Sequence, residues 1–149
     1  MQFLVAIDGS TPSERALEHA IALARAAGAS LTLVHAVDPE VYDEGGSAPV
    51  STLAEAANRL IREDVDDAEE RAEAVLQAAV EFAADRGVDA TTELVYGDPV
   101  EAVADFAAAE GFDDVFVGHR GLSDRAERVL GSVAKGLVER SSVSVTVVK

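Results

Sequence analysis

The sequence predicts a doubly wound α/β domain, in which helices cover both faces of a five-stranded parallel sheet. Short apolar runs alternate along the chain with longer segments whose apolar residues recur at helical spacing. The runs are almost continuously apolar, which is typical of strands covered on both faces. Strands joined by helices imply parallel neighbours and right-handed crossovers. With 149 residues and no evident linker or repeat, residues 1–149 are expected to form a single domain.

The first three elements are a strand at residues 3–7, a helix after it and a second strand at residues 31–37. Residues 11–14 read Thr-Pro-Ser-Glu, a capping box that starts at Thr11 and has proline at the first helical position. Apolar residues recur at helical spacing from there to Gly28, which is expected to end the helix.

The middle of the chain is acidic. Residues 38–50 contain two prolines, a Gly-Gly pair and several acids, and are expected to form an exposed loop. A long, strongly acidic helix is predicted from Ala54 to Arg86. A third strand at residues 91–96 leads to a second capping box at residues 98–101, whose helix is expected to stop at Gly111.

The last third contains a fourth strand at residues 113–117, a helix at residues 132–140 and a fifth strand from Val143 to Val148. If the fifth strand lies at the sheet edge, its free N–H and C=O groups can pair antiparallel with those of a second copy. The expected assembly is therefore a homodimer through this strand, or a larger assembly built from that dimer.

A glycine motif follows the fourth strand. It reads Gly118-His119-Arg120-Gly121, then nine residues, then Gly131-Ser132. Glycine lets the backbone approach a ligand closely, and a helix start supplies unpaired N–H groups that bind anions. A strand, a glycine loop and a helix start together predict a phosphate site.

Each residue of this motif has a second interpretation. Gly118 and Gly121 either lay their N–H groups against phosphate or only close a loop. Ser132 is a suitable N-cap by residue type, but its hydroxyl, with the N–H of Val133, could instead reach a phosphate at the Gly131 turn. Arg120 could pair with phosphate.

The motif resembles the nucleotide-binding motif of the universal stress protein family, in its ATP-binding type. Three further segments agree with that family: residues 3–10 with its first strand and turn, residues 35–37 with the end of its second strand, and residues 97–99 with the turn before its third helix. The similarity extends over nearly all of the chain. One departure is the pair His119-Arg120, where the family often has Ser or Thr followed by His.

The resemblance implies a strand order of 3-2-1-4-5 and an adenine nucleotide as ligand: ATP, or ADP or AMP, with any Mg²⁺ held by its phosphates. In this order the first and fourth strands are neighbours at the point where strand order reverses, where open α/β sheets bind ligands. Asp8, which ends the first strand, would then contact base or ribose, although an Asp-Gly-Ser turn is its simpler role. The resemblance also implies that Ala6, Ala36 and Val117 line the base pocket, although from the sequence alone ordinary core packing is the stronger interpretation.

Composition restricts the possible functions. The net charge of −16 argues against general nucleic-acid binding, because nucleic-acid phosphates require a positive surface. Such acidity is typical of a protein adapted to high salt, the alternative being an ordinary acidic cytosolic protein. The charge reverses in residues 118–149, which carry +3 against −19 for residues 1–117. An anion site in an acidic protein needs such a reversal.

Other site chemistries find little support. The chain has no cysteine, and its three histidines lack metal-ligand spacing, so no metal site from protein ligands alone is expected. No Walker or nucleophile-elbow motif is present, and no catalytic residue is predicted. No membrane segment is expected, and the cytoplasm is the expected location. We therefore expect a stress-response protein in which nucleotide binding is coupled to stability or assembly. The alternatives are a nucleotide-free dimeric interaction module and a slow phosphohydrolase.

Overall fold

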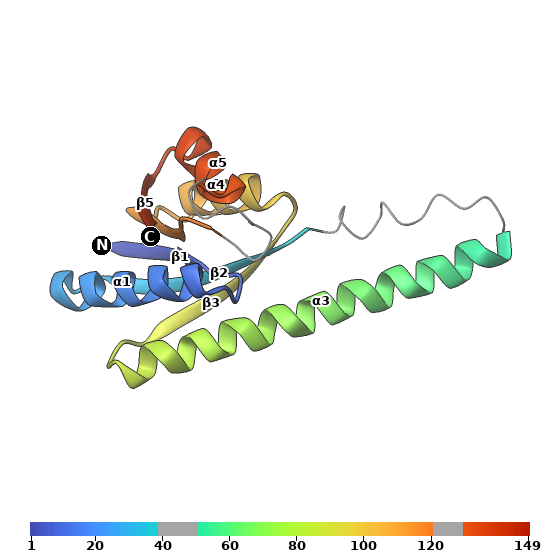
Figure 1. Ribbon diagram of the computed structural model, residues 1–149, viewed down its shortest axis with the longest axis horizontal. Helices are drawn as coiled ribbons and strands as arrows, with labels where there is room; N and C mark the ends of the chain where they lie inside the picture. The colour runs from blue at the N-terminus through green and yellow to red at the C-terminus, as the bar shows by residue number, and fades with distance from the viewer. Residues whose placement is uncertain (39–50, 121–129) are drawn as a thin grey trace.

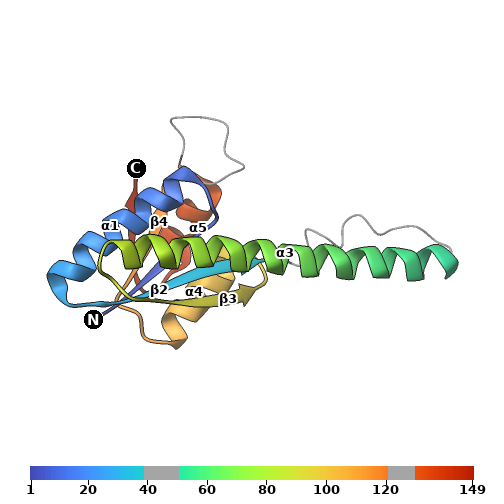
Figure 2. The ribbon, with the colours of Figure 1, turned by 90° about the horizontal axis from the view of Figure 1, so that it is seen from below.

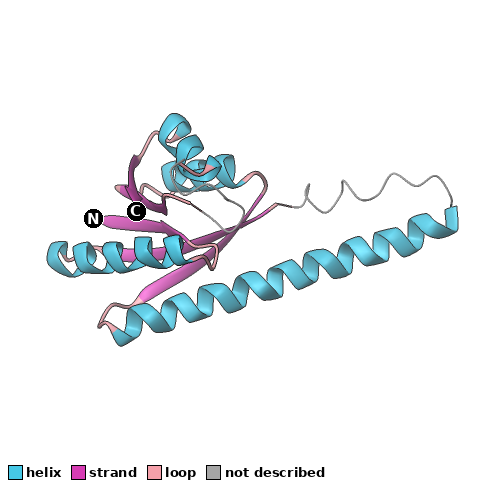
Figure 3. Cartoon of the chain, viewed as in Figure 1, coloured by secondary structure: helices cyan, strands magenta, loops and turns pink. Residues whose placement is uncertain are grey.

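The computed structural model describes residues 1–38, 51–120 and 130–149, and for residues 51–65 it describes the backbone only. Strands and helices alternate throughout (Figure 3). In chain order the elements are β1 (Gln2–Ala6), α1 (Thr11–Ala27), β2 (Ser30–Val37), α3 (Ser51–Asp85), β3 (Ala90–Tyr96), α4 (Pro99–Ala109), β4 (Asp114–Gly118), α5 (Ser132–Arg140) and β5 (Ser144–Val148).

The five strands form one parallel sheet in the order β3-β2-β1-β4-β5, as predicted. At its centre Val5 of β1 pairs with Leu33 of β2 and Phe116 of β4. Helices α1 and α3 cover one face, and α4 and α5 cover the other (Figure 1). Because β1 lies between β2 and β4, its carboxyl end is the point where the strand order reverses.

Alternate residues of the central strands face two separate halves of the core. Phe3, Val5 and Phe116 pack with α1 and α3, and the Phe3 and Phe116 rings are 5.1 Å apart. Leu4 and Val115 pack with α4 and α5 on the opposite face. Since both faces are covered, the strands need apolar residues at consecutive positions, which explains the runs seen in the sequence.

The helix ends agree with the sequence prediction in part. Gly28 ends α1 in the left-handed conformation at φ 66°, and the Asp98 side chain caps α4 by accepting from the N–H groups of Val100 and Glu101. The predicted N-cap of α1 was wrong. Ser10 is the cap, its side chain accepts from the N–H of Ser13, and Thr11 is the first helical residue.

Helix α3 begins at Ser51, three residues before the predicted start, and has 35 residues. Its C-terminal part buries a stripe of small and apolar side chains against the sheet: Ala68, Ala72, Leu76, Ala79 and Ala83. At 1.5 Å per residue the helix is roughly 50 Å long, and its N-terminal part extends beyond the sheet (Figures 1 and 2). No helix within the described residues is both long and apolar enough to cross a membrane.

Strand β5 lies at one edge of the sheet and β3 at the other. The β3 edge carries exposed polar residues, among them Thr91, Thr92 and Glu93. The β5 strand itself, Ser144–Val148, contains no charged residue. The sequence prediction of pairing between copies required an edge position for the fifth strand, and β5 has that position.

Candidate functional site

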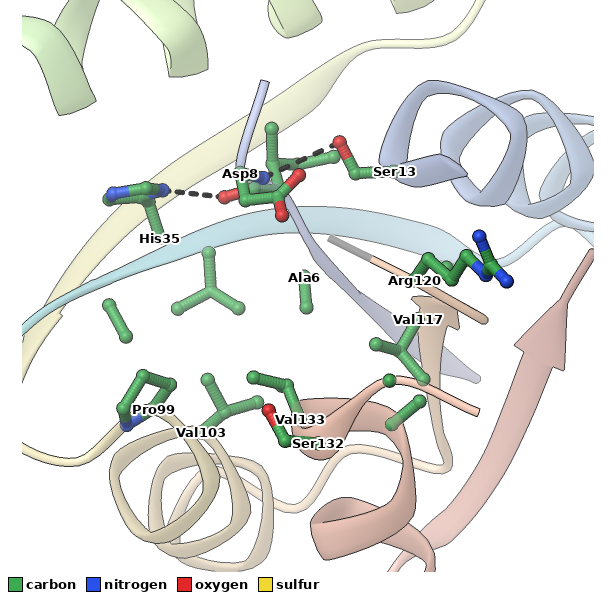
Figure 4. A pocket seen from close by; sticks show the side chains of 16 residues that line it. Ala6, Asp8, Ser13, His35, Pro99, Val103, Val117, Arg120, Ser132 and Val133 are labelled. Atoms are coloured by element: carbon green, nitrogen blue, oxygen red, sulfur yellow. Dashed lines mark hydrogen bonds between the residues drawn. The ribbon is translucent and has the colours of Figure 1, made fainter. Parts of the chain in front are cut away.

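A cavity of about 250 Å³ opens at the carboxyl ends of β1, β2 and β4, beside the N-terminus of α5 (Figure 4). Helix α4 closes it from the side opposite β1, through Pro99 and Val103. This is the switch point of the sheet, where α/β folds of this kind bind ligands. The sixteen lining residues are Ala6, Ile7, Asp8, Ser13, Val34, His35, Ala36, Pro99, Val103, Val117, Gly118, Arg120, Gly131, Ser132, Val133 and Ala134.

The cavity contains nine of the ten residues that the sequence singled out for nucleotide contact. They are Ala6, Asp8, Ala36, Val117, Gly118, Arg120, Gly131, Ser132 and Val133. The tenth, Gly121, lies outside the described residues. Residues from both ends of the chain therefore meet in one cavity, and their role as nucleotide contacts stays a prediction.

Asp8 lies in the turn between β1 and α1, and one of its carboxylate oxygens is held by that turn. Ser10 donates to Oδ1 of Asp8 from its backbone N–H at 2.9 Å and also from its hydroxyl. The Ser13 hydroxyl donates to the carbonyl oxygen of Ser10 at 2.9 Å and so fixes the cap from behind. Within the described part of the chain no group donates to Oδ2 of Asp8, so this oxygen is available to a ligand.

Small apolar side chains form one side of the cavity. Ala6 and Ala36 contribute from β1 and β2, and Val117 contributes from β4, all packed into the core cluster beneath α4 and α5. Val34 and Val103 complete this surface. Side chains of this size leave room above the sheet for a flat ring, whereas larger ones would fill it.

The N-terminus of α5 borders the cavity without a side-chain cap. Gly131 is the N-cap residue and has no side chain to bond the first-turn N–H groups, while Ser132 is the first helical residue. The predicted capping role of Ser132 was therefore wrong. Its exposed hydroxyl and the N–H groups of the first turn remain at the cavity rim, where the helix dipole favours an anion.

The two ends of the glycine motif are tied together by the backbone. The N–H of Gly131 donates to the carbonyl oxygen of His119 at 2.7 Å, and the N–H of His119 donates to that of Val148 at 2.8 Å. Gly118 has its own steric reason to be glycine. A Cβ there would lie 2.7 Å from the carbonyl carbon and oxygen of Pro12, so β4 and α1 could not approach as they do.

Arg120 contributes a buried cationic group next to the cavity. Its Nε and Nη2 atoms are buried and bond to no partner within the described residues. Figure 4 shows the guanidinium directed away from Ser132 and Val133, past Val117. Buried N–H groups of a guanidinium are costly unless they meet an acceptor, so an anion near this side chain would be stabilised.

Sequence reasoning missed several lining residues, of which His35 has the clearest polar role. Its Nδ1 lies 2.6 Å from the carbonyl oxygen of Ile7, to which it can only donate. A neutral ring then keeps Nε2 as an acceptor. The position of His35 just before Ala36 was a usable signal, because β2 also ends at this edge. Ser13, Pro99 and Ala134 come from three helices and had no comparable signal. Among the described residues, no three His, Cys, Asp or Glu side chains are placed to hold a metal ion.

Comparison with known proteins identifies the family of the chain. The chain matches the universal stress protein family over residues 1–149. It belongs to that family. The universal stress protein YxiE from Bacillus subtilis is 31% identical over 148 residues, which cover 99% of this chain and 98% of that protein. A universal stress protein from Thermus aquaticus is 34% identical, and the aligned residues cover 98% of this chain and 96% of that protein.

Solved structures of universal stress proteins share the fold. The protein UspA from Lactobacillus plantarum superimposes with a TM-score of 0.82 at 23% identity, covering 100% of this chain and 97% of that one. A universal stress protein solved in complex with cAMP has a TM-score of 0.68 at 27% identity, covering 100% and 96%. The family member from Archaeoglobus fulgidus, solved with dAMP, has a TM-score of 0.67 at 24% identity, covering 100% and 98%.

Proposed function

We propose that this member of the universal stress protein family binds an adenine nucleotide, ATP or else ADP or AMP, in the cavity at the carboxyl ends of β1 and β4. The observation that carries the proposal is the meeting of three different surfaces there. A small-residue apolar wall, a carboxylate with one free oxygen and an uncapped helix N-terminus border one cavity of about 250 Å³. Base, ribose and phosphate need these three kinds of surface.

Each part of the nucleotide has a counterpart in the residues present. The base would lie against Ala6, Ala36 and Val117, and Oδ2 of Asp8 would accept from the base or the ribose. The phosphates would extend along the Gly131 turn to the hydroxyl of Ser132 and the N–H of Val133. A volume of about 250 Å³ lies just below the usual range for ligand pockets, about 300–1,000 Å³, which suits base and ribose inside and phosphates at the rim. Arg120, whose Nε and Nη2 have no partner among the described residues, could complete the phosphate contacts by turning toward the rim.

The comparison at 27% identity supports the same ligand class, since that universal stress protein was solved with cAMP. The same fold is found with dAMP in the Archaeoglobus fulgidus protein and with AMP in one from Arabidopsis thaliana. We propose that any Mg²⁺ enters with the phosphates. Binding would be coupled to stability or to assembly of a homodimer through Val143 to Val148, rather than to fast catalysis. The protein would act in stress response in the cytoplasm, in a cell with high internal salt.

Calorimetric titration of ATP tests the proposal. Gly131 has β-region dihedrals, φ −61° and ψ 153°, so Gly131→Val is compatible with the backbone. It places two methyl groups where the phosphates would lie and should abolish ATP binding. Ser132→Ala should weaken ATP binding by about 1.5–3 kcal/mol, the range for a hydrogen bond to a charged group. Ser142→Ala, an exposed serine beyond the end of α5, is the matched control and should change nothing.

Two further measurements separate the parts of the site. Ser132 is not a cap, so Ser132→Ala should leave the melting temperature without ligand unchanged. Asp8→Asn, which keeps an acceptor for Ser10, should weaken ATP binding but leave inorganic tripolyphosphate affinity nearly unaltered. Equal ATP affinity in wild type and in folded Gly131→Val would contradict the proposal and favour a nucleotide-free interaction module.

A further inference from the structure

A second cavity, of about 440 Å³, lies between α1 and α3 on the other side of the β1–α1 turn. The two helices cross at an angle and diverge toward the N-terminus of α1, so the cavity lies between them near the turn (Figure 2). Its lining residues are Ile7, Gly9, Ser10, Ser13, Glu14, Leu17, Ala74, Val75, Ala78, Ala79 and Phe82. It shares Ile7 and Ser13 with the first cavity, but none of the residues assigned to nucleotide contact lines it.

The walls of this second cavity are mostly apolar. Leu17 and Ala79 are buried, and Val75 and Phe82 are half-buried. Ala74 and Ala78 are exposed on α3, and their small side chains leave the space between the helices open. A cavity of this size and composition, with a few polar groups, matches the general description of a small-molecule site.

The polar groups of this cavity differ in whether they are free to bind a ligand. The hydroxyls of Ser10 and Ser13 already donate within the cap of α1, to Asp8 and to the carbonyl oxygen of Ser10. Glu14 is the one charged lining residue. It lies one position beyond the place that a capping box requires, because the cap is Ser10. Within the described residues its carboxylate has neither an ion pair nor a hydrogen bond, so it is available to a ligand.

Within the described residues no basic side chain is paired with Glu14. The single ion pair among the described residues, Arg140 with Glu101, lies on the other face of the sheet. On α1, Glu18 follows Glu14 by one turn, and on α3, Glu70 precedes Ala74 by one turn, so both lie beside the lining residues. Two arginines also lie near the α3 side of the cavity: Arg71 precedes Ala74 by about one turn, and the Arg86 guanidinium stacks on the Phe82 ring, 3.4 Å from its centroid. Among the described residues, Glu14 is the charged group that lines the cavity itself.

We infer that this second cavity binds a small amphiphilic cation, meaning an ammonium group carried on an apolar or aromatic body. The ammonium group meets the carboxylate of Glu14, and the apolar body packs between Leu17 on α1 and Val75 and Phe82 on α3. An anion is rejected by Glu14, and a neutral molecule of the same shape gains only the apolar contact. The inference does not depend on the nucleotide proposal, because the two cavities lie on opposite sides of the turn.

Three indole compounds of matched shape test this inference on nucleotide-free protein at low ionic strength. Tryptamine is cationic, tryptophol is neutral and indole-3-propionate is anionic. For a ligand of this size a Kd on the order of 1 mM is expected for tryptamine. The backbone amide NMR signals of Gly9, Glu14 and Ala78 should shift with tryptamine. Tryptophol should bind about fivefold more weakly, as a partly exposed ion pair predicts, and indole-3-propionate more weakly still.

Two variants with matched controls locate the site. Glu14→Gln should weaken the binding of tryptamine about fivefold and leave the affinity for tryptophol unchanged. Glu139→Gln on α5 should change neither affinity. Ala78→Phe fills the cavity and should abolish binding of both compounds. Ala84→Phe, at an exposed alanine of the same helix that does not line the cavity, should have no effect. Circular dichroism confirms that each variant is folded.

Several results would overturn the inference. One is equal binding of the three compounds, and another is a tryptamine affinity that Glu14→Gln does not change. A third is the absence of amide shifts at 10-fold the expected Kd. Shifts of the same amides by a basic amphipathic peptide, but not by tryptamine, would identify a groove for a partner helix instead.

Discussion

The carboxyl group of Asp114 shows how one residue can make stability depend on pH. Asp114 begins β4, and burial raises its pKa above the ordinary 3.8, although a hydrogen bond from the hydroxyl of Thr146 on β5 partly opposes this. An acid with a raised pKa in the folded state holds its proton more tightly there than in the unfolded chain. Its ionisation therefore opposes folding, and the free energy of unfolding falls as pH rises from 3.8 through the folded-state pKa.

Replacing this carboxyl group should remove the pH-dependent loss of unfolding free energy. Asp114→Asn keeps an acceptor for Thr146 and should raise the melting temperature at neutral pH, with the gain shrinking toward zero below pH 3.8. Thermal unfolding of both proteins across a pH series measures the difference. Asp105→Asn, at an exposed position on α4, is the control. A neutral-pH melting temperature that Asp114→Asn lowers would contradict this account.

Gly118 lies where the fold leaves no space for a side chain. Its Cβ would lie 2.7 Å from backbone atoms of Pro12, which can move only if α1 moves. Gly118→Ala should therefore destabilise the fold by about 1–3 kcal/mol, the usual range for overpacking. Gly136→Ala on α5 is the matched comparison. Its Cβ would lie 2.6 Å from Cγ2 of Val100, but that is a side-chain atom and not backbone, and alanine favours a helix, so the loss should be smaller. Urea denaturation of the two variants gives the comparison, and equal losses would argue against a backbone contact at Gly118.

At the scale of the elements, the start of α1 connects the proposed nucleotide cavity to the fold. Ser10 caps the helix and donates to Asp8, whereas Thr11 makes no cap. Ser10→Ala should lower the free energy of unfolding by about 1–2 kcal/mol, and Thr11→Ala by much less. Chemical denaturation of both variants measures this. A larger loss from Thr11→Ala would restore the capping box expected from the sequence.

The order of helices and strands could be predicted because two local signals agree. Strands covered on both faces require apolar runs, and helices begin at Asp98 or end at Gly28 where cap chemistry demands these residue types. The exact caps were less predictable. Ser10 and Thr11 are both good N-caps by type, and the choice depends on the contact of Ser10 with Asp8. Such a contact exists only after the turn has formed.

The candidate site was predictable where its residues follow strand ends. Asp8 follows the end of β1 and Gly118 ends the neighbouring β4, so the strand order alone brings them together. Ser13, Pro99 and Val103 reach the cavity from α1 and α4. Their positions depend on how the helices pack on the sheet, and periodicity marks them only as helical residues. The burial of Nε and Nη2 of Arg120, which have no partner within the described part of the chain, is likewise a tertiary property, since residue type does not determine burial.

At the scale of the whole molecule, β5 provides the surface for the proposed homodimer. It is an edge strand without charge, whereas the opposite edge strand, β3, carries Glu93. Ser144→Lys places a cation from each copy into the antiparallel pairing and should shift the protein toward the monomer. Thr92→Lys on β3 is the matched control and should leave the assembly unchanged. Light scattering at micromolar concentration measures both. Wild type that is monomeric in molar salt would contradict the dimer.

The net charge of −16 should make the fold depend on salt. The chain has 12 basic and 28 acidic residues. A single ion pair, Arg140 with Glu101, lies within its described residues, so few of the acids described there are paired. Many acids lie on α3, where Asp66, Asp67 and Glu70 are exposed. At low ionic strength they repel one another. The Debye length shrinks from about 10 Å at 0.1 M salt to about 3 Å at 1 M, so molar salt should suppress this repulsion.

The melting temperature should therefore climb steadily between dilute buffer and molar KCl. Changing Asp66, Asp67 and Glu70 to their amides removes three charges from α3 and should raise stability in dilute buffer while flattening the salt dependence. Changing three basic residues to Gln should steepen the salt dependence of the melting temperature, because repulsion among the acidic side chains then increases. The three positions are Arg15, Arg25 and Arg71. Calorimetric melting in KCl, repeated in sucrose to exclude a general osmolyte effect, decides the matter. A flat or falling curve for the wild type would remove the case for adaptation to high salt and leave an ordinary acidic protein.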